Sequence, residues 1–480
     1  MTDKNYLVYC LHKIHGEKMF HLRPYQTNII DKTRSLFNQG EKSVLVQLPT
    51  GGGKTLLTAT MLATAASKGY RSWFIVHRRE LVKQTILAFS NLGIKNFGVI
   101  SSGFPEAKGF PIQICSIQTL IRRHKNYKQP QFIAFDECHH QAAGSWAKIY
   151  DTYSEAFHVG LTATPQRLDG SGLRRFFKQM VNGPSVASLI ADGYLSNYKL
   201  FAPNKLNLSN VHMQMGDFKK SEITDIMDTP SITGDAIAHY HKHGKDKRAV
   251  VFCVSVEHSK HVVQKFIQSG VAAEHVDGET DMQTRDAAIK KFQSGETKVL
   301  SNVDLFGEGF DLPAIEMAIL LRPTASLGLY LQQVGRALRP HPGKTHAIIL
   351  DHVGNCQRHG LPDDDREWSL DGREKKNTKS ETASVKVCPS CFAAQFAGSK
   401  TCKHCGYQYD VISREIEQRD GQLEEVDVKE LRRIKLIAQG RAKSKEALIE
   451  EGKRRGYKHP ERWAHYVWQA RQARLVNGKG

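Results

Sequence analysis

The stretch that most constrains this chain is the glycine-rich run VLVQLPTGGGKT at residues 44–55. Its apolar first half is typical of a buried strand, and the residues from Leu56 to Ser67 are typical of a helix that ends before Gly69. Between them, three successive glycines let the backbone adopt positive φ and present its N–H groups to phosphate oxygens. The run departs from the strict G-x-x-x-x-G-K-[ST] pattern at its first position, where Leu48 replaces glycine. We therefore predict a strand, a phosphate-binding loop and a helix, in this order.

The residues of this loop are candidates for binding ATP together with Mg²⁺. In loops of this kind the lysine reaches the β- and γ-phosphates and the next hydroxyl holds the metal ion, which assigns these tasks to Lys54 and Thr55. Gln26, just before a predicted helix at residues 28–37, is a candidate for selecting the base, because an amide can pair with the N6 and N7 edge of adenine. An ordinary polar residue at a helix start is the alternative. The other cofactor-binding candidates in the loop are Thr50, Gly51, Gly52 and Gly53.

A second candidate site follows the apolar run FIAF at residues 132–135. Asp136 and Glu137 come directly after this predicted strand, and burying two carboxylates there requires a positive partner such as a metal ion. Asp136 is therefore predicted to hold hydrated Mg²⁺, and Glu137 to orient and deprotonate an attacking water. His139 and His140 have no Cys or His neighbour at metal-ligand spacing, so we predict no metal site there.

Two further predicted strands end in polar side chains that suit phosphate contacts. His77 follows the run SWFIV, at the strand end where open α/β sheets bind ligands. The run IQICS likewise ends in a polar group that comprises Ser116, Gln118 and Thr119.

Length and composition place these motifs in a large, basic protein. A chain of 480 residues with 40% hydrophobic residues is long enough for two or three domains. No apolar run has transmembrane length and the first twenty residues carry charges throughout, so we expect neither a membrane span nor a secretory signal, and a cytoplasmic location. The formal net charge of +19 favours a polyanionic partner, with a solvated basic surface as the alternative.

The order of the short motifs in the first half indicates a family. RPYQ, PTGGGKT, DECH and TATP follow one another at a spacing that resembles the first RecA-like domain of a superfamily 2 helicase of the DEAD/DEAH type. The resemblance implies a second RecA-like domain. Residues 201–247 are polar and irregular and are expected to lead into it, and strands alternate with helical patterns over residues 248–352. We expect an α/β fold with two tandem parallel-sheet domains, at residues 1–204 and 205–355.

The second half contains no phosphate loop of its own. It does contain arginines that could complete the nucleotide-binding site of the first half. The run LYLQQVGRALRP places Gln332, Arg336 and Arg339 at spacings of four and three, on one side of a predicted helix. An arginine delivered from a facing domain would stabilise charge in the transition state of phosphoryl transfer. With the upstream run FGEGFDLP, this stretch resembles helicase motifs V and VI. The resemblance implies that Arg339 is the arginine finger, that Arg336 is a second γ-phosphate contact in a catalytic group with Gln332, and that Asp311 contacts the ribose or the linker.

The last quarter of the chain is predicted to contain a zinc site. Residues 356–387 are expected to form a charged linker, because their apolar content is low. Residues 388–410 then contain two C-x₂-C pairs separated by ten residues, a spacing that closes a tetrahedral Zn²⁺ site. A redox pair and an iron–sulfur cluster fit this spacing less well. The predicted zinc ligands are Cys388, Cys391, Cys402 and Cys405.

Residues 411–480 are predicted to form a basic helical tail, whose aromatic residues could stack on bases or pack on the motor. A motor core followed by a four-cysteine ribbon resembles the RadD-type bacterial DNA-repair helicases and their phage relatives. This implies a monomeric nucleic-acid-dependent ATPase that prefers DNA to RNA, with a repair or single-strand-binding protein as a candidate partner. Two alternatives stay open, the motor subunit of a restriction or phage-defence complex and an ATP-switched clamp that does not unwind.

Overall fold

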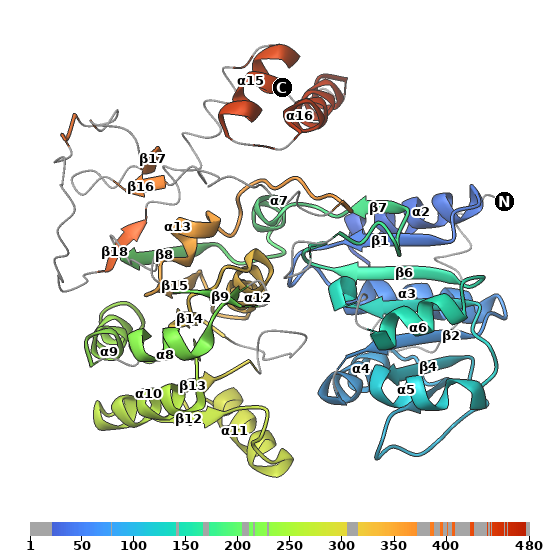
Figure 1. The fold of residues 1–480 in the computed structure, drawn as a ribbon, viewed down its shortest axis with the longest axis horizontal. Helices are drawn as coiled ribbons and strands as arrows, with labels where there is room; N and C mark the ends of the chain where they lie inside the picture. The colour runs from blue at the N-terminus through green and yellow to red at the C-terminus, as the bar shows by residue number, and fades with distance from the viewer. Residues whose placement is uncertain are drawn as a thin grey trace.

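The structure is a computed structural model. It describes residues 22–77, 79–140, 144–166, 172–203, 211–214, 217–227, 230–304 and 315–371, together with 385–387, 394–396, 401, 406–408, 423–426, 439, 442, 444–455, 457 and 459–476. Two sheets lie side by side in this part of the chain, each with helices on both faces (Figure 1). No helix in the described ranges is long and apolar enough to cross a bilayer.

The first domain is built on seven strands that all run parallel. They are β1 (Ser43–Gln47), β2 (Ser72–Val76), β3 (Phe97–Ile100), β4 (Ile112–Ser116), β5 (Phe132–Asp136), β6 (Phe157–Thr162) and β7 (Gln179–Asn182). Their order in the sheet is β3-β4-β2-β5-β6-β1-β7. The central strands are buried on both faces, which is why their sequences are almost continuously apolar. Because β5, β6 and β1 are neighbours, the residues that follow these strands meet at one edge of the sheet.

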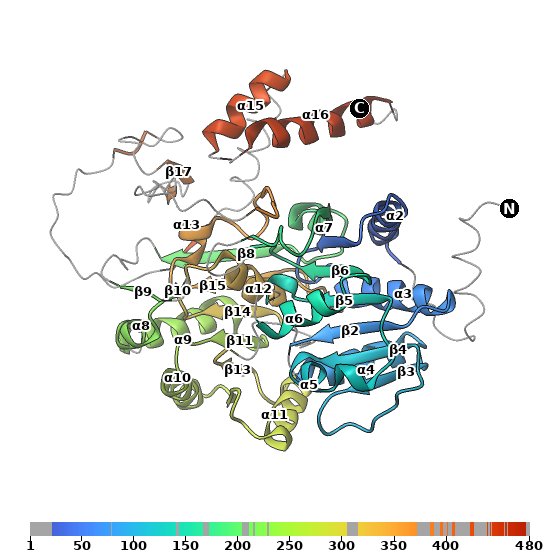
Figure 2. The ribbon, with the colours of Figure 1, turned by 45° about the vertical axis from the view of Figure 1, so that its right-hand side comes forward.

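Helices cover both faces of this sheet (Figure 2). One face packs against α2 (Pro24–Asn38), α3 (Lys54–Ser67) and α4 (Arg79–Asn91), and the other against α5 (Ile117–Arg123) and α6 (Gly144–Thr152). Two short 3-10 turns, η1 (His124–Asn126) and η2 (Cys138–His140), follow α5 and β5.

The second domain repeats this design with six parallel strands and one antiparallel edge strand. The strands are β8 (Tyr198–Pro203), β11 (Ala249–Phe252), β12 (Ala273–Val276), β13 (Val299–Asn302), β14 (Met317–Leu320), β15 (Ala347–Asp351) and β18 (Leu423–Val426). Their order is β12-β13-β11-β14-β15-β8-β18, and only β18 runs antiparallel to its neighbour. The helices are α7 (Val186–Ala191), α8 (Lys220–Met227), α9 (Pro230–Gly244), α10 (Val256–Gln268), α11 (Met282–Ser294), α12 (Leu327–Ala337) and α13 (Asn355–His359).

Two tandem parallel-sheet domains were predicted and are confirmed, but the boundary at residue 204 is wrong. Strand β8 lies before that boundary and yet pairs with β15 of the second sheet, because Leu200 and Phe201 are buried in the second core. The chain passes from β7 of the first sheet to α7, whose Leu189 packs in the second core. We call the next residues, 192–197, which lead from α7 into β8, the crossing segment. The predicted irregular connector is also more ordered than expected. It contains α8, α9 and a small hairpin of β9 (Met213–Gln214) and β10 (Asp217–Phe218).

Residues 361–371, which were predicted to be part of an exposed linker, return from the second domain to the first. We call them the return segment. The side chain of Leu370 is only 3% exposed and packs in the first domain's core. The carbonyl of Leu370 accepts hydrogen bonds from the N–H groups of Leu173 and Arg174, at 2.8 and 3.1 Å. The average composition of this stretch is charged, so the burial of one leucine could not be foreseen from it.

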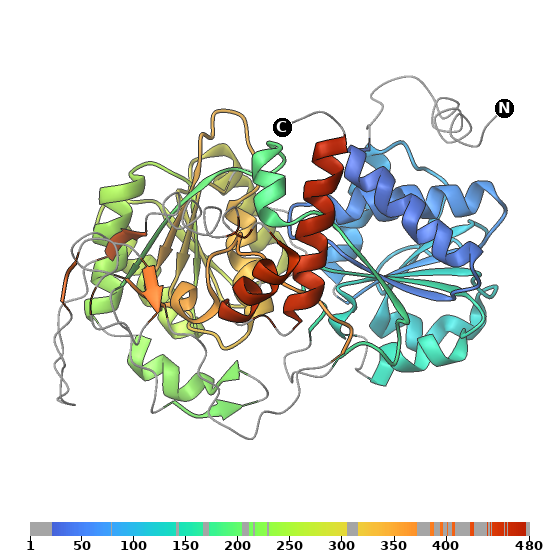
Figure 3. The same ribbon diagram turned by 90° about the horizontal axis from the view of Figure 1, so that it is seen from above.

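The C-terminal part contributes a pair of helices, α15 (Lys445–Arg454) and α16 (Pro460–Val476), that lie over the junction of the two domains (Figure 3). Their shared core includes Leu448 and Ala464. The pair contacts the return segment, where Glu367 accepts a hydrogen bond from the N–H of His459 at 3.1 Å. A further hairpin is formed by β16 (Val385–Val387) and β17 (Ala394–Phe396). The four predicted zinc ligands lie outside the described residues.

Candidate active site between the two domains

The phosphate loop has the backbone that its glycines predicted. Gly51 and Gly53 adopt φ of +83° and +82°. Steric crowding also favours glycine at position 53, because a Cβ there would lie 2.4 Å from Nε2 of Gln26. No side chain caps the N-terminus of α3, so the first N–H groups of this helix are available to an anion.

Lys54 and Glu137 form an ion pair at the centre of the site. Nζ of Lys54 lies 3.1 Å from Oε1 of Glu137, and the two side chains are 14% and 5% exposed. Glu137 has a φ of +47°, an uncommon conformation for a residue with a side chain and one that often marks functional positions. The ion pair therefore joins the residue predicted to bind phosphate with the residue predicted to act as the base.

Asp136, at the end of β5, fits the role of a cation ligand. Burial raises the pKa of Asp136 to about 6, and the neighbouring Glu137 adds to this rise, while Lys54 and His77 oppose it. Two adjacent carboxylates, of which Glu137 pairs with one lysine, leave negative charge that a divalent cation would neutralise. Thr55, the second predicted Mg²⁺ ligand, is exposed in the first turn of α3.

His139 connects this pair to the end of β6, a role that the sequence did not predict. Its Nδ1 lies 3.5 Å from Oε2 of Glu137 and 3.2 Å from Oγ1 of Thr162. Thr162 in turn donates a hydrogen bond to the carbonyl of Thr164 at 2.9 Å. Thr164 contacts the second domain, since a Cβ on Gly328 of α12 would lie 2.8 Å from its Oγ1. This chain of contacts links the predicted base to the other domain.

Gln26 holds the phosphate loop from the side of α2. Its Nε2 donates to the carbonyls of Gly52 and Gly53, both at 3.3 Å, and its Oε1 accepts the N–H of Arg23 at 2.9 Å. The hydroxyl of Tyr25 donates to the carbonyl of Gly52 at 2.8 Å. A role for Gln26 in base selection stays a prediction.

Helix α12 packs directly on the phosphate loop. A Cβ on Gly335 would lie 2.7 Å from Cβ of Thr50, so only glycine permits this approach. Gln332 and Arg336 lie on α12, in the helix that the sequence predicted, and both are buried there.

Arg339 is not on α12, contrary to the prediction. The helix ends at Ala337, because the residue before Pro340 is disfavoured in the helical conformation. Arg339 therefore lies on the turn that follows, where its Cγ is 3.7 Å from the position that a Cβ on Gly51 would take. The predicted finger thus lies against the loop it was expected to serve. Asp311 is outside the described residues.

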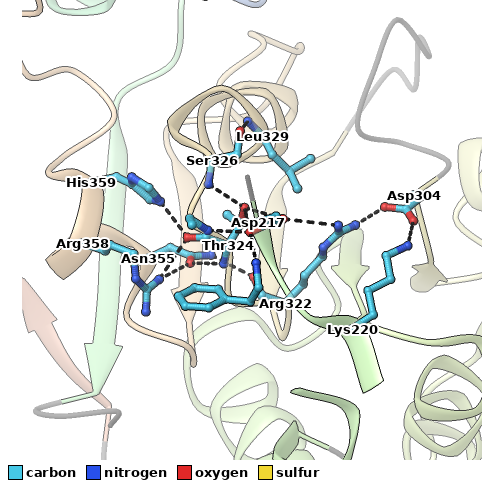
Figure 4. A network of polar contacts seen from close by, with 12 residues as sticks. Asp217, Lys220, Asp304, Arg322, Thr324, Ser326, Leu329, Asn355, Arg358 and His359 are labelled. Carbon is cyan, nitrogen blue, oxygen red and sulfur yellow. Dashed lines mark hydrogen bonds and ion pairs between the residues drawn. The ribbon is translucent and has the colours of Figure 1, made fainter. Parts of the chain in front are cut away.

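A polar network fixes the start of α12 (Figure 4). Asp217, on β10, accepts hydrogen bonds from the N–H of Ala325 at 2.7 Å and from the hydroxyl of Thr324 at 3.0 Å. Arg322 lies 3.6 Å from Asp217 and also pairs with Asp304. The segment predicted to be an irregular connector therefore orients the arginine-bearing helix, and no local sequence signal indicates this.

This fold and this site define an ATPase with a phosphate loop on one RecA-like domain and arginines on the next. Residues 19–167 match the family model described as "Type III restriction enzyme, res subunit", and residues 233–341 match "Helicase conserved C-terminal domain".

The chain is also similar to individual proteins. A 51.5 kDa protein of a Lactococcus phage is 33% identical over 402 residues, which cover 82% of this chain and 84% of the phage protein. The putative ATP-dependent helicase IRC3 of Saccharomyces cerevisiae is 30% identical over 355 residues, which cover 69% of this chain and 51% of the yeast protein. A fragment structure of a putative HsdR subunit of a type I restriction enzyme from Vibrio vulnificus has a TM-score of 0.58 at 22% identity, over 76% of this chain and 69% of that one. The chain belongs to the superfamily 2 helicases of the DEAD/DEAH type, and it is an ATP-hydrolysing enzyme of that group.

Proposed function

We propose that this protein is a DNA-stimulated ATPase that hydrolyses ATP between its two RecA-like domains and uses the closure to move along a DNA strand. The observation that carries the proposal is the packing of Gly335 on Thr50. This contact brings the turn that bears Arg339 to the phosphate loop, which also contains Lys54, the partner of Glu137.

The residues suggest how hydrolysis proceeds. An incoming triphosphate draws Lys54 away from Glu137, because the phosphates carry more negative charge than one carboxylate. The freed Glu137 then orients a water and takes its proton as the water oxygen attacks the γ-phosphorus and the bond to the β–γ bridging oxygen breaks. Arg339 and Arg336 neutralise charge on the γ-phosphoryl oxygens. Mg²⁺, held by Thr55 and Asp136, would supply charge neutralisation on the β- and γ-phosphates.

The carboxyl ends of β2 and β4 are candidates for contacting the DNA backbone. Nε2 of Gln118 donates to the carbonyl of His77 at 2.5 Å, and Oγ of Ser116 lies 3.0 Å from Oγ1 of Thr119. These contacts bring polar groups of two neighbouring strands together at the ligand-binding edge of the sheet. The net charge of +19 supports a polyanionic partner, and the preference for DNA over RNA rests on the resemblance to the RadD-type repair helicases.

Zinc is proposed for the segment after the return segment. Cys388 and Cys391 fall in the connection between the paired strands β16 and β17, and Cys402 and Cys405 fall between Thr401 and Gln408, which form an antiparallel bridge. Each C-x₂-C pair thus lies between two paired segments, which supports a ribbon closed by one Zn²⁺. Elemental analysis should find one zinc per chain, and Cys388→Ser should release it while ATP hydrolysis without DNA persists. Iron, or no metal in a folded parent protein, would refute this site.

A second candidate function is the motor of a restriction or phage-defence complex. It is favoured by the match of residues 19–167 to the restriction-enzyme family model and by the shared fold of the HsdR fragment. The motor chemistry would be unchanged, and the partner subunits would determine which DNA is acted on.

One set of rates tests the proposal. ATP hydrolysis by the parent protein is measured alone and with single-stranded DNA, duplex DNA, a forked duplex and RNA of equal length. We expect DNA to stimulate turnover more than RNA does, and a strand-displacement assay with the best activator then separates unwinding from translocation alone. Lys54→Ala is the matched control and should abolish turnover with every activator. Stimulation by RNA alone, or by none of the four, would contradict the proposal.

A further inference from the structure

Lys344 closes the C-terminal end of α12. Its partly buried ammonium group donates hydrogen bonds to three backbone carbonyls, those of Ile315 at 2.9 Å, of Arg339 at 2.8 Å and of Ala337. Ala337 is the last residue of the helix, and Arg339 is the predicted finger. The carbonyls at a helix C-terminus lack partners within the helix and carry partial negative charge, so an ammonium is well suited to this position.

The crossing segment holds the same turn from the other side. The N–H of Ser196 donates to the carbonyl of Leu338 at 2.7 Å, and its hydroxyl donates to the carbonyl of Arg339 at 3.3 Å. The preceding residue, Leu195, packs on the phosphate loop, since a Cβ on Gly51 would lie 2.7 Å from its Cδ2. Every carbonyl from residue 337 to residue 339 thus accepts a hydrogen bond from Lys344 or Ser196.

We propose that Lys344 and the crossing segment are positioning elements for ATP hydrolysis, which hold the turn that bears Arg339 against the phosphate loop. The inference deepens the proposed function and rests on the role of Arg339 given there. Arg339 follows the end of a helix and precedes a proline, so the helix itself does not fix its backbone. Lys344 and Ser196 supply that constraint from two other parts of the chain.

The first test compares Lys344→Met with Lys344→Arg. Lys344→Met removes the donors but keeps an unbranched side chain, so the turn that bears Arg339 should shift away from the phosphate loop. We therefore expect kcat to fall about 10- to 100-fold, with KM for ATP within about 3-fold of the parent value. Lys344→Arg retains a charged donor and should recover most of the loss. Lys265→Met, on the exposed face of α10, is the control for loss of a lysine from the second domain and should keep parent kinetics.

The second test asks whether the loss acts through Arg339. Arg339→Ala alone should lose most of the turnover, and adding Lys344→Met to it should cost little more, because the positioned group is already absent. An equal fold-loss from Lys344→Met in both backgrounds, or an unchanged kcat in the parent background, would overturn the inference. An active Arg339→Ala protein would instead refute the finger and leave no role for its positioning.

The dependence of kcat on pH, measured at alkaline pH, tests the inference in the parent protein itself, so this test does not depend on whether a variant folds. Burial lowers the pKa of Lys344 to about 8, with Lys247 lowering it further and Glu316, which pairs with Lys247 and Arg248, raising it. As the pH rises through about 8 the ammonium loses its charge, so kcat of the parent should decline there, and Lys344→Arg should keep its rate. A parent profile that stays flat well above this pH would contradict the inference.

Ser196→Ala removes one of the hydrogen bonds to the turn and should lower kcat a few-fold, in proportion to one hydrogen bond.

Discussion

At the scale of single residues, the pairing of Lys54 with Glu137 makes the two halves of the chemistry mutually dependent. The lysine that is predicted to bind phosphate pairs with the proposed base at 3.1 Å. In the proposed mechanism, nucleotide binding and activation of Glu137 are therefore one event. His139 extends this coupling to Thr162, and through Thr164 to the second domain. These contacts connect the phosphate loop to α12.

Glu137→Gln tests this coupling. The amide cannot accept a proton, so turnover should fall about 10²- to 10⁴-fold, the usual contribution of a general base. ATP affinity should not fall, because Lys54 no longer has a charged competitor for the phosphates. Equilibrium binding and single-turnover hydrolysis measure the two effects separately. Turnover at the parent rate would show that Glu137 is not the base.

The positions that were predicted correctly share one property, which is that the sequence immediately around each of them determines the local structure. The strand, glycines and helix at residues 43–67 follow directly from local pattern, and so does the placement of Asp136 and Glu137 after a buried strand. Ser196 could not be found in this way, because its partner Arg339 is 143 residues away in the chain. Lys344 and Asp217 belong to the same class, since their contacts exist only once distant segments have packed.

At the scale of elements, the return segment differs most from what its composition indicated, because its charged composition predicted an exposed linker and the structure packs it against both domains. It leaves the second domain, contributes Trp368 to the lining of a cavity of about 130 Å³ between the domains, and then inserts Leu370 into the first core. The C-terminal helix pair contacts it through His459. The segment therefore contacts both domains and the helix pair.

Two variants of the return segment show which contact anchors it. Leu370→Ala removes a buried side chain and should lower the free energy of unfolding by about 2–3 kcal/mol, or detach the segment so that a protease cleaves near it. Asp371→Asn breaks the pair with Arg174 at 2.8 Å, but both side chains are more than half exposed, so its effect should be about 1 kcal/mol or less. Thermal unfolding and limited proteolysis provide the comparison. A larger effect from Asp371→Asn would reverse the assignment.

At the scale of the whole molecule, the charge balance has a measurable consequence. If the net charge of +19 serves DNA binding, the affinity for DNA must fall as the salt concentration rises, because binding releases counterions from the DNA. Each neutralised phosphate contributes about −0.9 to the slope of log affinity against log salt on duplex DNA, so three or more contacts give a slope of about −2.7 or steeper. Fluorescence anisotropy over a salt series measures it. A slope near zero would mean that the basic surface has another purpose.

The central claim is that one ATP is hydrolysed between two domains, with Arg339 of the second acting on phosphates held by the first. The most direct measurement is the steady-state turnover of Arg339→Ala with saturating single-stranded DNA, beside its affinity for ATP. We expect turnover to fall about 10³-fold or more, the scale of an arginine finger, while ATP affinity stays close to that of the parent. A variant that keeps most of its turnover would contradict the account, because hydrolysis would then need only the first domain.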